Sequence, residues 1–182
     1  RGFKIELKKV KKISNRLKSK LMLDATASVG LEENHDLADA IGFSSCKGLF
    51  GLTGGAFICY NQKQKNEIDS FYLNLENHLN KKMTGPYHTI CSLFEVLKNH
   101  ENLKQSVFIN KSKFIKKFNK HVIYPNSIQP NICTYSKKKI FRLKKNVILY
   151  KSRGELEGSI VSHLGEVHLG RKASGDIIKS IK

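Results

Sequence analysis

Apolar and polar positions along the chain predict a mixture of helices and strands. Within 3–19, apolar residues from Leu7 onward recur every three or four positions with lysines between them, which is typical of an amphipathic helix. The short apolar run KLMLDA at 20–25 predicts a fully buried strand that ends at a charged residue. Two more strands are expected at 41–44 and 56–60, on either side of a glycine-rich turn. This order of elements indicates an α/β fold rather than an all-helical one.

The second half of the chain has a weaker pattern. After a polar, linker-like stretch, residues 70–80 are expected to be irregular or weakly helical. Apolar residues between Pro86 and Leu97 predict an amphipathic helix with the proline near its first turn. Beyond it, short β-like runs are expected at 107–109, 122–124 and 147–150, before a helix in GDIIKSI at the end. A domain boundary is expected within 80–105.

Composition adds one strong signal, which is charge. The 182 residues are 40% hydrophobic, which allows a sizeable core, but 33 Lys and Arg against 15 Asp and Glu give a net charge of +18. Such a charge leaves open a lysine-rich nucleic-acid-binding protein. Only five of the 33 are arginine, the residue on which phosphate and base recognition usually depends, so this alternative is disfavoured. No apolar run is long enough to span a membrane, so we expect a cytoplasmic protein without a membrane partner.

Cysteine and histidine spacing does not indicate metal chemistry. The four cysteines, at positions 46, 59, 91 and 133, form no C-x-x-C pair and no zinc-like pattern with histidine. We therefore expect no metal site and reduced thiols.

Candidate chemistry concentrates between residues 20 and 60. Asp24 follows an apolar strand, at the kind of strand end where open α/β sheets present groups to a ligand. Lys47 lies 23 residues later inside the turn SSCKGLFG, where Gly48 and Gly51 allow the backbone to fold closely. The turn is not a phosphate-binding P-loop, because G-K-[ST] is absent. From spacing alone, a capping aspartate and a solvated lysine are the simpler explanation.

The amino-acid sequences of these segments resemble those of a known family. LMLDATASVG followed by HDLADAIGFSSCKGLFGLTGGAFI resembles the class V, fold type I pyridoxal-phosphate aminotransferases, and most closely the 2-aminoethylphosphonate–pyruvate and alanine–glyoxylate group. KKMTGPYHTICSLFEVL (81–97) is similar to the start of the helix that links the two domains of that family, and SHLGEV (162–167) to its last strand motif. The resemblance is specific in 20–60 and looser after 105.

The resemblance implies roles for particular residues. Lys47 would form the Schiff base with pyridoxal 5'-phosphate and act as general acid and base, and Asp24 would hold the ring nitrogen protonated. Thr26 would pack on the ring, while Ser45 and Cys46 would lie near the cofactor phosphate, with Cys46 departing from the usual family residue. Thr84 would reach the phosphate of the other subunit in a homodimer, although a helix cap is its alternative. His35, His88 and His163 are expected to be ordinary, non-catalytic histidines.

The family pattern also implies substrates and a division of the chain. The expected reaction moves an amino group from 2-aminoethylphosphonate or a small amino acid to pyruvate or a similar 2-oxo acid. The arginine that would clamp the substrate carboxylate falls at Ile160, so Arg153 is the candidate to replace it.

We expect 1–80 to be the C-terminal part of the large cofactor-binding domain, 81–105 a linking helix, and 106–182 a small α+β domain. The family's phosphate loop and ring-stacking aromatic residue have no counterpart here, so the resemblance implies a C-terminal half. An inactive homologue that keeps the fold is the other alternative.

Overall fold

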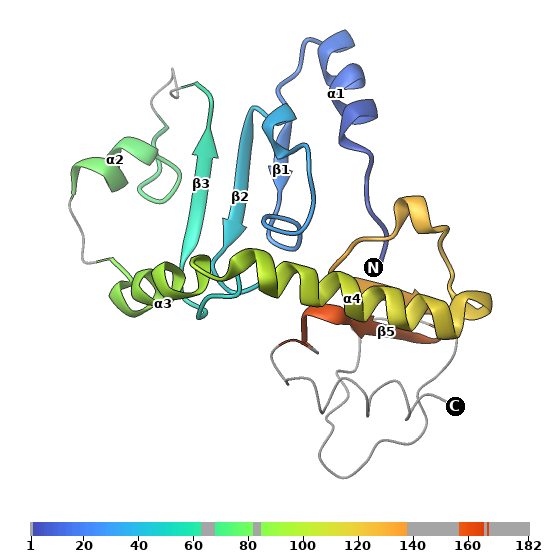
Figure 1. Cartoon of the computed structure of the whole chain (residues 1–182). Coiled ribbons are helices and arrows are strands. Elements are labelled where there is room, and N and C mark those ends of the chain that lie inside the picture. Colours follow the sequence, from blue (N-terminus) through green and yellow to red (C-terminus); the bar gives the residue numbers. More distant parts are fainter. Residues whose placement is uncertain (1, 63–67, 82–84, 138–156, 166, 168–182) are drawn as a thin grey trace.

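The computed structural model describes residues 2–62, 68–81, 85–137, 157–165 and 167. These residues form two small sheets and a series of helices (Figure 1). The α-helices are α1 (Leu7–Arg16), α2 (Leu75–Asn80), α3 (Tyr87–Leu97) and α4 (His100–Phe118), and the 3₁₀ helices are η1 (His35–Leu37), η2 (Asn119–His121) and η3 (Asn126–Ile128). The strands are β1 (Met22–Asp24), β2 (Ala40–Ser44), β3 (Ala56–Tyr60), β4 (Cys133–Ser136) and β5 (Ser159–Ser162).

The larger sheet has the strand order β1-β2-β3. β1 and β2 are parallel, with Asp24 opposite Gly42, and residues 25–39 make the connection between them. β2 and β3 are antiparallel, with Ser44 opposite Ala56, and the glycine-rich turn joins them. The parallel pairing brings the carboxyl ends of β1 and β2 to the same edge of the sheet, which is where a ligand site is expected in an α/β fold.

The strand predicted at 20–25 is present but differs from the expectation in length and burial. Only Met22–Asp24 pair with β2, and β1 is not a buried strand, since Met22 is 78% exposed. The prediction of full burial was therefore wrong: an apolar run identifies a strand, but burial also needs something to cover it, and no described residue covers Met22.

In Figure 1, α3 and α4 follow one another below the strands of the larger sheet, and β5 lies on the other side of α4. The prediction of a β-like run at 107–109 was wrong, because these residues lie inside α4. Val107, Asn110, Phe114 and Phe118 are buried at intervals of three or four, which is the period of one helix face. The run of three apolar residues at 107–109 suggested a strand, although the buried residues of this segment follow the helical period.

The second sheet pairs β4 with β5 in antiparallel register, with Cys133 opposite Ser162. The sequence pattern did not predict β4. The run expected at 122–124 forms only an isolated bridge from Val122 to Ser136, so a strand there was wrong. The strand expected at 147–150 and the helix expected in GDIIKSI lie outside the described residues.

The hydrophobic core joins the two halves of the structure. One cluster of buried residues brings together the turn after β1, the loop after β2, α4 and the segment after β5, through Leu31, Phe50, Val107 and Leu164. A second cluster packs the end of α4 against β5 through Phe114, Phe118 and Val161. The loops at the sheet edge therefore rest on α4. No helix in the described part of the chain is long and apolar enough to cross a membrane.

Two glycines allow the turn after β1 to touch the loop after β2. A Cβ at Gly48 would collide with the carbonyl oxygen of Val29, and one at Gly30 would lie 2.5 Å from the Gly48 carbonyl oxygen. Gly30 also has φ +82°, a conformation that glycine adopts without strain. The backbone contact between the two loops thus depends on residues without side chains.

We expect Gly48→Ala to lower the free energy of unfolding by about 1–3 kcal/mol, because the added methyl group must push two backbone segments apart. Gly42→Ala is the matched control, since a Cβ there meets nothing within 4 Å, and its effect should stay within about 0.5 kcal/mol. Urea denaturation of the full chain measures both. Equal stability of the two variants would contradict the close contact.

Candidate active site at the carboxyl ends of the parallel strands

Asp24 and Lys47 lie at the same edge of the larger sheet. Asp24 ends β1, and Lys47 follows the end of β2 by three residues. Their charges interact, because Lys47 helps to lower the pKa of the Asp24 carboxyl group. Both residues are exposed, and Lys47 makes no ion pair within the described part of the chain. The structure thus brings together an anionic and a cationic group that face solvent and are not neutralised by each other.

The Asp24 carboxylate is held in place by Thr26. The Thr26 backbone N–H donates a hydrogen bond of 3.0 Å to Asp24 Oδ1. A hydrogen bond from the Thr26 side chain is the largest cause of the lowered pKa of Asp24, ahead of this backbone bond. Asp24 is therefore an anion at neutral pH with a fixed orientation. The same bonds form a local turn motif of the kind that caps a strand end, so they do not by themselves require a ligand.

Ser45 closes the loop that carries Lys47. Its hydroxyl is fully buried, donates to the Leu52 carbonyl oxygen at 2.6 Å and accepts from the Gly55 N–H at 3.2 Å. Inside the loop, the Phe50 N–H donates to the carbonyl oxygen of Lys47 at 2.9 Å. This bonding fixes the backbone on both sides of Lys47 while its side chain remains exposed.

His100, at the start of α4, binds the backbone of the same loop through a hydrogen bond. Its Nε2 lies 2.8 Å from the Gly48 carbonyl oxygen. Since a carbonyl can only accept, Nε2 must carry the proton and donate. The imidazole also packs edge-on against Phe50, with the ring centres 5.5 Å apart. No sequence pattern indicates His100 as a functional residue, because a single hydrogen bond across 52 residues imposes no regular spacing.

The structure describes three of the other predicted site residues: Thr26, Ser45 and Cys46. The Ser45 hydroxyl faces the loop rather than solvent, and Cys46 is half-buried with its sulfur 3.5 Å from the Ser44 hydroxyl, so their predicted contacts with a phosphate stay predictions. Thr26 stands beside Asp24, as described. Thr84 and Arg153 lie outside the described residues. Ile160 is on β5, opposite Tyr135.

Of the histidines that were expected to be non-catalytic, two have a ring nitrogen within hydrogen-bond distance of a hydroxyl group. His35 Nε2 lies 2.8 Å from the Ser28 hydroxyl, and burial is the main cause of its lowered pKa. His163 is fully buried in the small sheet region, with Nε2 2.9 Å from the Thr134 hydroxyl. His88 is exposed on α3. No group of histidine, cysteine and carboxylate residues that could hold a metal ion occurs within the ranges that the structure describes.

The fold is similar to that of solved aminotransferases. An alanine–glyoxylate aminotransferase from Nostoc sp. matches with a TM-score of 0.60 and 16% sequence identity, over 74% of this chain and 42% of that chain. A phosphoserine aminotransferase from Cytophaga hutchinsonii matches with a TM-score of 0.57 and 12% identity, over 76% of this chain and 46% of that chain. The chain thus spans less than half the length of either structure. No protein-family model and no curated protein sequence matches it.

At these identities the likeness shows the fold alone. The described residues have a mixed helix and sheet architecture that is similar to part of these two structures, which confirms the predicted α/β class. The more specific fold type I assignment stays a prediction. The division into 1–80, 81–105 and 106–182 stays a prediction. α3 and α4 together run from residue 87 to residue 118 with a break at 98–99, so helical structure extends beyond the expected linking segment.

We expect Thr26→Val to raise the pKa of Asp24 toward its ordinary value of 3.8, because the variant loses the hydroxyl that stabilises the charged form. Carbon-detected NMR titration of the aspartate carboxyl groups measures the change. Asp39 is the internal control: its pKa is lowered chiefly by a hydrogen bond from Lys11 and should not move. An unchanged Asp24 titration would show that the Thr26 hydroxyl does not hold the carboxylate.

Proposed function

We propose that this chain is part of a pyridoxal-phosphate-dependent aminotransferase, with Lys47 as the lysine that binds the cofactor aldehyde and Asp24 as the carboxylate that faces its ring nitrogen. The observation that carries the proposal is the placement of these two residues at one edge of the sheet, at the ends of neighbouring parallel strands. The likeness of the fold to two aminotransferases and the resemblance of the sequence around both residues support it.

The chemistry of the donor set fits the cofactor. Pyridoxal phosphate supplies an electron sink that stabilises negative charge at the substrate carbon, provided that its ring nitrogen is protonated. Asp24 would favour that protonation, since a charge-assisted hydrogen bond is worth about 1.5–3 kcal/mol. The Asp24 carboxylate is already anionic and oriented by Thr26, and no described residue pairs with the Lys47 ammonium.

The residues around the candidate site have different proposed roles. The Lys47 amine binds the cofactor and, once released, holds and returns the proton of the substrate carbon. Ser45 and His100 keep the Lys47 backbone in place through the bonds described above. Thr26 would pack against the ring beside Asp24. Cys46 and Thr84 are proposed phosphate contacts.

The activity of the whole protein is a further part of the proposal, because the chain spans less than half of the aminotransferases it matches. We infer an amino donor such as 2-aminoethylphosphonate or a small amino acid, a 2-oxo acid acceptor such as pyruvate, and a homodimer. Arg153 is the proposed clamp for the substrate carboxylate, in place of the arginine missing at 160. Each of these rests on the sequence resemblance.

We expect Lys47 to be the preferred site of cofactor attachment. After incubation of the full chain with substoichiometric pyridoxal phosphate and reduction with borohydride, peptide mapping should find most of the label on Lys47. The reason is that its amine is exposed and that the oriented Asp24 carboxylate at the same sheet edge can pair with the protonated ring nitrogen. Lys47→Arg should lose this label. Lys104→Arg is the matched control, since Lys104 is a partly exposed lysine on α4.

Because the chain has 33 basic residues, pyridoxal phosphate could also label exposed lysines without any specific site. Label spread evenly over exposed lysines, and unchanged in amount by Lys47→Arg, would be ordinary surface chemistry and would overturn the assignment. Label on Lys47 without turnover in the longest expressed form of the protein would instead indicate the inactive homologue.

A further inference from the structure

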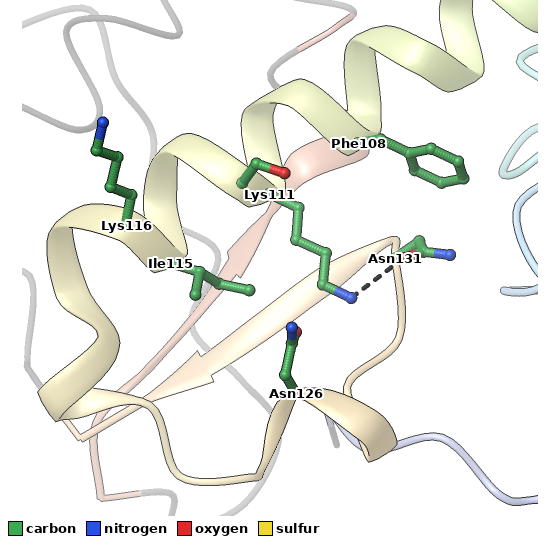
Figure 2. Close-up of a pocket in the computed structure, with 7 residues that line it drawn as sticks. Phe108, Lys111, Ile115, Lys116, Asn126 and Asn131 are labelled. Atoms are coloured by element: carbon green, nitrogen blue, oxygen red, sulfur yellow. Dashed lines mark hydrogen bonds between the residues drawn. The ribbon is translucent and has the colours of Figure 1, made fainter.

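A groove runs along α4 on the side that faces the segment between α4 and β4. Side chains from α4 form one wall, and polar side chains from η3 and the residues before β4 form the other (Figure 2). The lining residues are Phe108, Lys111, Ser112, Ile115, Lys116, Asn126 and Asn131. No carboxylate is among them.

The central feature of this groove is a buried lysine. Lys111 is only 9% exposed, although Lys113 and Lys116 of the same helix are exposed. Its Nζ donates to the Gln129 carbonyl oxygen and to Asn131 Oδ1, both at 3.1 Å. An ammonium group has three donors, so one N–H remains without an acceptor among the described residues.

The carboxylate that interacts electrostatically with Lys111 does not neutralise it. Glu32 favours the charged form of Lys111, but it makes no ion pair with it in the described part of the chain. Instead, Glu32 pairs with Lys4 at 3.2 Å and accepts the Asn131 N–H. Burial outweighs the effect of Glu32, and Lys4 acts in the same direction as burial, so the pKa of Lys111 is lowered.

A buried cation without a paired anion is costly, and an anionic ligand would remove that cost. Figure 2 shows the Lys111 side chain reaching across the groove toward Asn131 and Asn126, whereas Lys116 extends away from it. Asn126 is exposed and its amide makes no hydrogen bond within the described residues, so it can donate to the same ligand. The Ser112 hydroxyl is a third potential donor at the lining.

We propose that this groove binds the anionic group of a small molecule, a carboxylate or a phosphate, at the free donor of Lys111, with Asn126 as a second contact. Phe108 and Ile115 provide an apolar wall for the body of an organic anion. The site is built from α4 and the segment before β4, so it does not depend on Asp24 or Lys47 and is independent of the proposed aminotransferase function.

The test is an NMR titration of the ¹⁵N-labelled full chain at fixed ionic strength, with benzoate, inorganic phosphate and neutral benzyl alcohol as probes. We expect saturable shifts for benzoate or phosphate that centre on Lys111 and Asn126. Tighter binding of benzoate assigns the site to an organic carboxylate, and tighter binding of phosphate assigns it to a phosphate group. Benzyl alcohol should cause markedly smaller shifts.

Variants decide whether Lys111 is responsible. Lys111→Met should weaken binding about tenfold or more, the effect of losing one charge-assisted hydrogen bond. Lys113→Met is the matched control, because Lys113 is exposed on α4 and does not line the groove, and affinity should be unchanged. Shifts spread over the exposed lysines, or equal for Lys111→Met and wild type, would overturn the proposal.

If Lys111→Met does not fold, Asn126→Ala provides a second variant in which anion binding can be measured. Asn126 is an exposed residue of η3, so its removal should leave the fold intact while weakening anion binding by about threefold, as expected for a neutral hydrogen bond. Unchanged affinity in Asn126→Ala, together with equal binding of benzoate and benzyl alcohol, would exclude an anion site.

Discussion

The close contact between two backbone turns, one after β1 and one after β2, determines how the candidate site is held together. Gly48 lies against the carbonyl oxygen of Val29, and Gly30 lies against the carbonyl oxygen of Gly48. Side chains at these positions would separate the turns, and with them the ends of the strands that carry Asp24 and Lys47. His100 then ties the same backbone to α4 with a hydrogen bond of 2.8 Å. The relative position of the two candidate site residues is thus a consequence of backbone packing.

The site edge was the part most readily predicted from sequence. β2 and β3 were expected because β-branched and aromatic residues flank a run of glycines, and the structure places these strands where they were predicted. The fastening of the Lys47 loop by Ser45 and His100 could not be predicted, because each is a single polar contact to a distant backbone group. Such contacts impose no periodic pattern on the sequence.

Burial was harder to predict than secondary structure. The run at 20–25 is apolar enough for a core strand, but Met22 is exposed, because burial depends on neighbours that the pattern does not encode. In α4 the opposite error occurred: Val107 was assigned to a strand because its neighbours are apolar. The other buried residues on its helix face, Asn110 and Phe114, lie one and two turns further along the helix. Lys111 is the clearest case, since nothing in a lysine-rich helix distinguishes a buried lysine from a solvated one.

The central claim is that Asp24 and Lys47 face the same cofactor, and the protonation of the cofactor ring tests it most directly. The chain should be loaded with pyridoxal phosphate labelled with ¹⁵N in the ring, and the ¹⁵N chemical shift measured near pH 8 for wild type and Asp24→Asn. The account predicts a protonated ring nitrogen in the wild type and an unprotonated one in Asp24→Asn, with the cofactor attached to Lys47 in both. The same chemical shift in both proteins would contradict it, because Asp24 would then have no contact with the ring.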